Sequence, residues 1–340
     1  MTTLKDVAKE AGVSVTTVSY VLHKGQYVSP QMHDKVMAAV NKLGYVGNMS
    51  ARSLRRGRTG IIEIAVHELD MPYFYSKFAQ IMAAAVERHG FEPLIIPTNL
   101  KRDRVERELE RIAKQMCDGL VMYSEQLPGE RMRALAMANR PVVLFDDHTA
   151  SGMFDTVLAP NEMEGRAAAE HLIDMGCRHI GVVGFSAPGK ADDAAGADVR
   201  RLRGIRAAML EHGLSMTERD YGAAGWTVES GHAAAQSVIA LALPFDGVIC
   251  VNDGVAFGLI RGLADRGITV PDSMKVIGFD GISLGAYCVP RISTVALDLE
   301  DVAEKTVSML VSRIEGTYEG AARRETAGYR LIARESTLGR

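Results

Sequence analysis

The chain has 340 residues, of which 47% are hydrophobic and 24% charged, and its net charge is −3. This length exceeds that of one small domain, and the mixture is that of a globular protein with a large core, which excludes a disordered chain. No apolar run approaches the roughly 18–20 residues that span a bilayer and no signal peptide precedes Leu4, so we expect a cytoplasmic protein.

The N-terminal stretch carries the pattern of three short helices. Gly12 permits the left-handed backbone of a tight turn, and Ser14 behind it is a favourable N-cap for a second helix. A third helix would begin at Ser29 and Pro30 and end at Gly44. Two short helices joined by such a turn form a helix-turn-helix. The expected inward-facing residues, at helical spacing, are Leu4, Val7, Ala8, Val18, Val21, Leu22, Val36, Ala39, Val40 and Leu43.

Charge is divided unevenly along the chain. Residues 1–60 contain nine Lys and Arg against three Asp and Glu, a net charge of +6. The remainder carries 30 basic and 39 acidic residues, a net charge of −9. A basic module on an acidic body is the electrostatic pattern of a tethered DNA reader, although the net charge of the whole chain conceals it.

Several motifs identify the family that this chain resembles. Asp6-Val7-Ala8, Ala11-Gly12-Val13-Ser14, Thr17-Val18-Ser19 and Leu43-Gly44-Tyr45 are similar to the head of the LacI/GalR family of bacterial transcription regulators. The segment from Asn48 to Gly57 resembles the hinge helix of that family, and the similarity continues through the whole chain. The resemblance implies a helix-turn-helix head over 1–47, a hinge helix and linker over 48–59, and an effector-binding and dimerisation body over 60–340.

From Gly60 onward, apolar strand-like runs alternate with amphipathic helical stretches, a pattern that indicates parallel sheets with helices on both faces. The resemblance implies a periplasmic-binding-protein-like body of two doubly wound α/β lobes. The lobe near DNA would contain 60–160 with 294–324, and the far lobe 161–292 with 325–340. The expected strands are 61–66, 94–96, 119–123, 141–145, 155–158, 180–183, 221–224, 248–251, 275–279, 293–297 and 328–334, and the expected helices 74–89, 102–116, 162–175, 201–212, 228–241, 254–266 and 302–314.

The second helix of a helix-turn-helix enters the major groove, where its early residues meet base edges. Thr16 can exchange hydrogen bonds there, Val15 offers a methyl contact, and Tyr20 offers a hydroxyl and an apolar ring. The alternative is that these three are ordinary solvated residues. None is an Arg or Asn that would specify a base bidentately, so the operator sequence stays open. With the phosphate contacts and the hinge positions of the family, the expected DNA-binding residues are Ser14, Val15, Thr16, Thr17, Ser19, Tyr20, Asn48, Ala51, Leu54 and Arg55.

Leu54 lies among Arg52, Arg55 and Arg56 and has no evident core to join. In the family that the chain resembles, the matching leucine is paired across the dimer axis, where it wedges into the minor groove and kinks the duplex. Such apolar wedges unstack a base step in exchange for a larger contact surface. The alternative is that Leu54 packs on the body. A hinge helix this short is marginal alone, so its folding can depend on DNA and on dimer geometry.

Ligands of open α/β sheets bind at the carboxyl ends of the strands. In this chain those ends carry carboxylates, an amide, aromatic rings and one arginine. Asp146 or Asp280 could instead cap a neighbouring helix, and Tyr73 could be ordinary core. From strand ends and motif positions together, the expected effector-binding residues are Tyr73, Phe74, Ser124, Asp146, Arg201, Trp226, Asn252, Asp253 and Asp280.

These side chains suit a sugar, because hydroxyls can bridge carboxylates and a guanidinium while the apolar face of a sugar packs on an aromatic ring. A purine, a phosphorylated compound or another non-sugar effector acting as corepressor is the alternative. The loop over 186–198 is longer and more acidic than that of the family, which leaves its role and the identity of the ligand open.

Sequence signals for an enzyme are weak. Gly181-Val182-Val183-Gly184 lacks the third glycine of a dinucleotide-binding turn, and no nucleophile elbow or Walker loop occurs. Asp146-Asp147-His148 is better explained as a polar turn than as a metal site, and the four cysteines have no metal-ligand spacing. We expect no catalytic residue, no metal and no cofactor. A free-standing solute-binding protein would need a secretion signal and would have no basic head.

The sequence therefore predicts a ligand-responsive DNA-binding regulator, most simply a repressor of a carbohydrate gene cluster. One head on each subunit of a two-fold homodimer implies palindromic half-sites. Without a leucine-heptad tail, we expect a dimer and no tetramer.

Overall fold

The computed structural model describes residues 2–23, 28–45, 58–67, 69, 74–99, 102–123, 133, 136, 140–148, 152–186, 196–217, 220–222, 225–240 and 245–339. The chain forms two compact units, Met1–Thr59 and Gly60–Arg340, which we call the head and the body. Across these described ranges, no helix is long and apolar enough to cross a membrane. The predicted hinge contacts Asn48, Ala51, Leu54 and Arg55 lie outside them.

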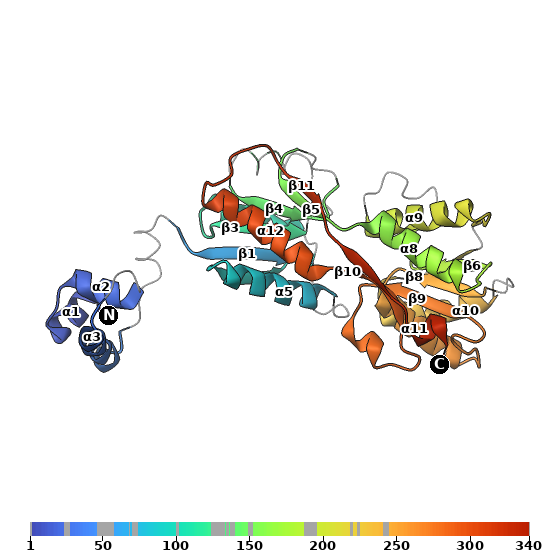
Figure 1. Ribbon diagram of the computed structural model, residues 1–340, viewed down its shortest axis with the longest axis horizontal. Coiled ribbons are helices and arrows are strands. Elements are labelled where there is room, and N and C mark those ends of the chain that lie inside the picture. The colour runs from blue at the N-terminus through green and yellow to red at the C-terminus, as the bar shows by residue number, and fades with distance from the viewer. Residues whose placement is uncertain are drawn as a thin grey trace. The chain divides into compact units, whose positions relative to one another are not determined.

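Three helices form the described part of the head: α1 (Leu4–Ala11), α2 (Val15–His23) and α3 (Pro30–Leu43) (Figure 1). The Thr3 side chain caps α1, and Gly12 ends it with a left-handed φ of 61°. Ser29 caps α3, and Gly44 ends it with φ 56°. The sequence pattern is confirmed, since the buried core of the head consists of Val7, Ala8, Ala11, Val18, Val21, Val36 and Ala39.

The first sheet of the body has the strand order β11-β5-β4-β3-β1-β2, and all its neighbours are parallel. Helices α5 and α12 pack on one face, and α6 contributes Ile112 to the cluster on the other. The elements of this first lobe are β1 (Ile61–Val66), α5 (Phe74–Arg88), β2 (Glu92–Pro97), α6 (Arg102–Ala113), β3 (Gly119–Tyr123), β4 (Val142–Phe145), β5 (Asp155–Leu158), α12 (Leu299–Ile314) and β11 (Arg324–Thr326).

The second sheet has the matching order β12-β10-β9-β8-β6-β7, and β12 runs antiparallel to β10. Figure 1 shows α8 and α9 on one face of this sheet and α10 and α11 on the other. The elements of this second lobe are α8 (Asn161–Asp174), β6 (Ile180–Val183), α9 (Ala197–Glu211), β7 (Tyr221–Gly222), α10 (Val228–Ala240), β8 (Gly247–Cys250), α11 (Asp253–Ala264), β9 (Lys275–Phe279), η2 (Ser283–Ala286), β10 (Ser293–Leu297), β12 (Tyr329–Ile332) and α13 (Glu335–Leu338).

The two lobes repeat one local feature at the end of a sheet strand. Phe145 ends β4 and Phe279 ends β9, and each is followed by an aspartate with a left-handed backbone, Asp146 at φ 54° and Asp280 at φ 96°. The amide of each aspartate donates to the strand that follows next in its sheet, 2.8 Å to the Val157 carbonyl in the first lobe and 3.1 Å in the second. Both carboxylates therefore lie at the carboxyl ends of their sheets, where ligands of such sheets bind.

The strands that return between the lobes correct the predicted lobe boundaries. β10 pairs with β9 and β12, so 293–297 belongs to the second lobe and not to the first. β11 was not predicted, and it pairs with β5 in the first lobe. Its three residues are all exposed, so hydrophobic periodicity gives no signal for it. The described chain passes between the lobes at 158–161, 297–299 and 326–329.

A buried ion cluster holds β11 in the first sheet. Asp155 accepts hydrogen bonds from Arg313 Nη2 at 2.9 Å and from the Arg323 amide at 2.8 Å. Although burial alone raises the pKa of Asp155, the hydrogen bonds from these two arginines hold it below its usual value. A depressed folded-state pKa contributes stability above the unfolded pKa of about 3.9, and this stability is lost as the pH falls through the folded value.

We therefore expect Asp155→Asn to lower the free energy of unfolding by about 3 kcal/mol at pH 7, because two half-buried guanidinium groups lose their counter-ion. The difference from wild type should shrink in acid, below the unfolded pKa of the aspartate. Urea denaturation at several pH values measures both effects, with the exposed Asp272→Asn as the control. An Asp155→Asn protein as stable as the control at pH 7 would contradict this role.

Glycines let helices of the second lobe touch at backbone distance. A Cβ added to Gly204 would lie 1.9 Å from the carbonyl oxygen of Glu162, and one added to Gly165 would lie 2.0 Å from that of Arg201. α8 and α9 therefore cross with their backbones in contact. This crossing fixes the position of Arg201, which faces the cavity described next.

Candidate functional site

The exposed face of α2 carries the predicted base-reading residues. Val15 is 38% and Tyr20 39% exposed, whereas Val18 on the opposite face is fully buried. The predicted N-cap is confirmed, because the Thr17 amide donates to Ser14 Oγ at 3.0 Å. The two hydroxyls of this pair are also 2.8 Å apart, so they are oriented together at the start of the helix. Thr16 is exposed and Ser19 half-buried.

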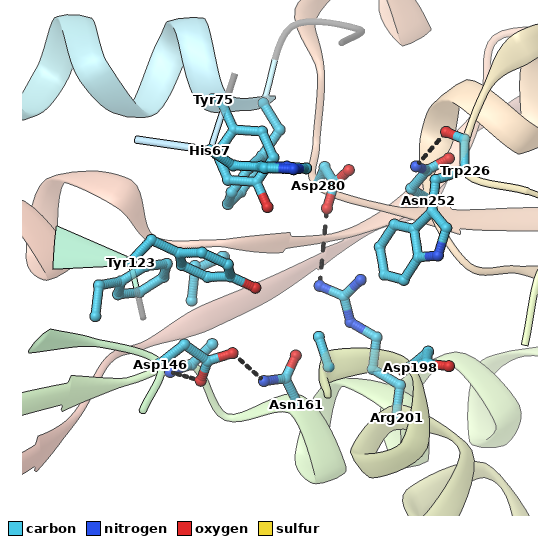
Figure 2. A pocket seen from close by; sticks show the side chains of 15 residues that line it. His67, Tyr75, Tyr123, Asp146, Asn161, Asp198, Arg201, Trp226, Asn252 and Asp280 are labelled. Carbon is cyan, nitrogen blue, oxygen red and sulfur yellow. Dashed lines mark hydrogen bonds and ion pairs between the residues drawn. The ribbon is translucent and has the colours of Figure 1, made fainter. Parts of the chain in front are cut away.

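The body contains a cavity of about 400 Å³ that side chains of both lobes line (Figure 2). Its size is that of pockets for small molecules. Of the predicted effector contacts, it brings together Phe74, Asp146, Arg201, Trp226, Asn252 and Asp280. Tyr73, Ser124 and residues 187–195 of the predicted loop lie outside the described residues.

One wall of the cavity is aromatic. Tyr75 lies between His67, with ring centroids 5.2 Å apart, and Tyr123 at 5.7 Å, both edge to face. Phe145 adjoins Tyr123 at 5.8 Å. Across the cavity lies Trp226, which is 40% exposed and is the only tryptophan of the chain. Rings on opposite sides can hold the apolar faces of a flat or ring-shaped ligand.

Arg201 is the cation of the cavity floor and is nearly fully buried. Its Nε donates to Glu164 at 3.2 Å, its Nη1 donates to the Val251 carbonyl at 3.0 Å, and its Nη2 lies 3.7 Å from Asp280 Oδ1. Its guanidinium also lies 4.4 Å from the ring centre of Phe279. Although burial alone lowers the pKa of Arg201, Glu164 and Asp280 raise it, so the side chain is a fixed cation.

Two other predicted contacts hold neighbouring elements as well as lining the cavity. Asp146 accepts from Asn161 Nδ2 at 2.9 Å and from the Ala159 amide at 3.0 Å, which ties β4 to the start of α8. Asn252 caps α11 and donates from Nδ2 to the Trp226 carbonyl at 2.9 Å. The helix-capping alternative is not borne out for Asp146, because α8 has no side-chain cap hydrogen bond at its N-cap Pro160.

Two predictions need correction. Asp253 does not line the cavity: it is fully buried, and its Oδ2 accepts from the Ile282 amide at 2.9 Å. Burial, with the nearby charge of Asp280, raises the pKa of Asp253 well above its usual value, and the side chain has a structural role. Arg201 does not begin its helix, because α9 starts at Ala197 and Arg201 lies in its second turn.

Sequence reasoning missed part of the lining. The residues concerned are Tyr75, Tyr123, Phe145, Ala159, Asn161, Ala197, Asp198 and Leu297, whereas His67 follows the first strand, where ligands are expected. Tyr123 and Phe145 end β3 and β4, so the rule that ligands bind at carboxyl ends could have found them. Asn161 is buried, and its Oδ1 accepts no hydrogen bond from the described residues. That orphan acceptor at the cavity wall calls for a donor from a ligand. No metal-ligating cluster occurs among the described residues.

Sequence comparisons match both units. The model for bacterial regulatory proteins of the lacI family matches residues 3–48, and that for a periplasmic binding protein-like domain matches residues 169–337. The HTH-type transcriptional repressor PurR of Mannheimia succiniciproducens is 30% identical over 318 residues, covering 92% of each chain. The Ribose operon repressor of Halalkalibacterium halodurans is 27% identical over 340 residues, covering 100% of this chain and 98% of its own. These relatives are repressors and not enzymes.

Solved structures of similar proteins have the same fold over nearly the whole chain. The transcriptional regulator CelR in complex with cellobiose superposes with a TM-score of 0.73 at 27% identity, over 99% of this chain and 100% of that one. The lac repressor dimer bound to operator superposes with a TM-score of 0.83 over 99% of each chain, and at 21% identity it supports the fold alone. The predicted fold class, two parallel-sheet α/β lobes behind a helical head, is confirmed.

Proposed function

This chain belongs to the LacI family of bacterial regulatory proteins and is a DNA-binding transcriptional repressor, and we propose that a neutral sugar bound in the body cavity controls it. The observation that carries this choice is the set of polar groups in the cavity. Asp146, Asp198 and Asp280 offer carboxylate oxygens, and Asn161 offers a buried acceptor that has no partner among the described residues. Many acceptors call for a ligand with many hydroxyl donors.

The charge of the lining argues against a phosphorylated ligand. Arg201 is the cation of the cavity floor, and it is already paired with Glu164 and faces Asp280. Among the described lining residues, a phosphate would meet three carboxylates and no unpaired guanidinium, and like charges repel strongly in a cavity of low dielectric constant.

A nucleobase is the second candidate, and the aromatic wall favours it. His67, Tyr75 and Tyr123 could stack on a purine opposite Trp226. The names of similar proteins point both ways, since they include PurR, a ribose operon repressor and a regulator in complex with cellobiose. We favour the sugar because a purine offers few donors to the acceptors of this cavity.

We propose that the head reads a palindromic operator as part of a homodimer in the cytoplasm, with Val15, Thr16 and Tyr20 at base edges and Ser14, Thr17 and Ser19 near phosphates. Val15, Thr16 and Tyr20 are exposed on α2, which supports this assignment. Ser14 is exposed just before α2, and Thr17 and Ser19 are half-buried on it. We assign 48–59 as the hinge helix and linker. Ligand closure of the two lobes would shift the first lobes across the dimer axis and fold or melt the hinge helices.

A thermal-shift screen against neutral sugars, nucleobases and sugar phosphates tests the effector class. A ligand that binds only the folded body raises the melting temperature by mass action, by an amount equivalent to about 2.7 kcal/mol at 100 times its Kd. We expect shifts with neutral sugars alone. Shifts confined to nucleobases would replace the sugar by the second candidate, and shifts with sugar phosphates would contradict the charge argument.

The hinge assignment predicts that Leu54→Ala weakens operator binding by roughly 10-fold or more while the melting temperature stays that of wild type, because an inserted apolar side chain helps to kink DNA. Fluorescence anisotropy with a labelled operator measures the loss. Ser53→Ala, next to it in the chain, is the control. Equal affinities of Leu54→Ala and wild type would remove Leu54 from the DNA contacts.

A further inference from the structure

Glu164 is a buried carboxylate directly behind the cavity floor. Its side chain has no exposed surface, and its Oε2 lies 3.2 Å from Nη2 and accepts from Nε of Arg201, also at 3.2 Å. Its other oxygen accepts no hydrogen bond from the described residues. Glu164 does not itself line the cavity. It can therefore act on a ligand only through Arg201.

The backbone contact between α8 and α9 holds this pair together. Gly165, the next residue after Glu164, leaves room for the carbonyl oxygen of Arg201, which a Cβ would approach to 2.0 Å. The residue next to the acid thus touches the backbone of the residue that carries the guanidinium. Because the two helices cannot separate without losing this contact, the ion pair has little freedom to rearrange.

The pair changes what Arg201 can recognise. A free buried guanidinium binds carboxylates or phosphates bidentately and strongly. Here Nε is occupied by Glu164, one Nη1 hydrogen by the Val251 carbonyl, and the positive charge is balanced by Glu164 with Asp280 close by. The remaining N–H groups can still donate to a hydroxyl or a carbonyl oxygen. They offer an incoming anion little net attraction.

We propose that Glu164 is a specificity-determining positioning residue, which neutralises Arg201 so that the cavity accepts neutral polyhydroxylated ligands and rejects carboxylated or phosphorylated ones. This inference rests on the cavity being the effector site and deepens that assignment. If Glu164 had only a structural role, its replacement by the isosteric amide glutamine would leave the ligand preference of the cavity unchanged.

Trp226 lines the cavity and is the sole tryptophan, so its fluorescence reports on the cavity. The measurement uses the whole chain and does not require an identified effector. Quenching by iodide and by caesium at constant ionic strength measures the local charge. The variant is Glu164→Gln, which keeps the shape of the side chain and removes its charge. Glu162→Gln is the control, since it removes the same charge from an exposed position of the same helix.

We expect caesium to quench wild-type Trp226 more strongly than iodide when each quenching constant is divided by that of the same ion for free tryptophan. In Glu164→Gln the iodide quenching constant should rise roughly threefold, as expected for loss of one charge near a partly screened site, with no change in Glu162→Gln. Inorganic phosphate should raise the melting temperature of Glu164→Gln and leave that of wild type unchanged. An iodide constant in a folded Glu164→Gln equal to that of the control would overturn the proposal.

A variant that fails to fold does not end the test, because the wild type gives two independent readings. Stronger quenching by iodide than by caesium after normalisation to free tryptophan, or a phosphate-induced thermal shift, would each contradict a neutralised arginine. The quenching and phosphate results test the charge of the cavity and do not depend on whether a sugar is the effector. A protein whose cavity excludes anions but whose operator binding responds to no neutral sugar would keep the charge assignment and refute the sugar.

Discussion

Replacing Arg201 by Gln should weaken effector binding about 100-fold, equivalent to about 2.7 kcal/mol, because the ligand loses donors on the cavity floor and Glu164 and Asp280 lose their cation. The operator affinity of the effector-free protein should stay unchanged, since the head is a separate compact unit. Isothermal titration with the sugar found by thermal shift measures the first quantity, and anisotropy measures the second.

Arg201→Gln should also lower the free energy of unfolding by about 3–5 kcal/mol, because it leaves buried carboxylates unpaired. Burial already raises the pKa of Glu164 and of Asp280, so without the cation these acids should take up protons. The double variant Arg201→Gln/Glu164→Gln separates the two effects. It should recover much of the stability and none of the effector affinity. Wild-type effector affinity in a folded Arg201→Gln protein would show that the ligand binds elsewhere.

The second large effect is expected from Gly204→Ala. The added Cβ would meet the Glu162 carbonyl oxygen at 1.9 Å, so α8 and α9 must move apart. Overpacking of this kind costs about 3 kcal/mol, and the better helix propensity of Ala offsets about 1 kcal/mol of it. Because Arg201 lies one turn earlier in α9, the shift should also weaken effector binding by roughly 10-fold.

Urea denaturation and effector titration measure these two effects of Gly204→Ala. Leu210→Ala on the same helix is the control, since Leu210 is 74% exposed and its truncation should change stability by less than about 0.5 kcal/mol. A Gly204→Ala protein with the stability and effector affinity of the control would mean that the helix crossing has room to adjust.

The sequence predicted correctly those features that depend on residues close to one another in the chain. Helical spacing and capping predicted the head, because Gly12, Ser14 and Gly44 act within a few residues of themselves. The strand ends led to Asp146, Asn252 and Asp280, because parallel strands carry their carboxyl ends to one edge.

The sequence was insufficient where partners are distant. β11 consists of exposed residues, so no periodic pattern marks it. It is held in the sheet by the ion pair between Asp155 and Arg323, which are far apart in the sequence. Asp253 resembles its cavity-lining neighbour Asn252 in type and position. Only its hydrogen bond with the Ile282 amide shows that its side chain points away from the cavity. No sequence pattern marks Glu164 as functional, since a glutamate in a helix is normally exposed. Its role depends on an arginine 37 residues later.

The most direct test of the central claim combines DNA selection with ligand response. Random duplexes enriched on the full-length protein should converge on a palindrome, and anisotropy with that duplex should then show that a neutral sugar changes the affinity. We predict this change in wild type and its loss in Arg201→Gln. A palindrome whose affinity responds to no neutral sugar, or responds equally in Arg201→Gln, would contradict control of this repressor by a sugar in the body cavity.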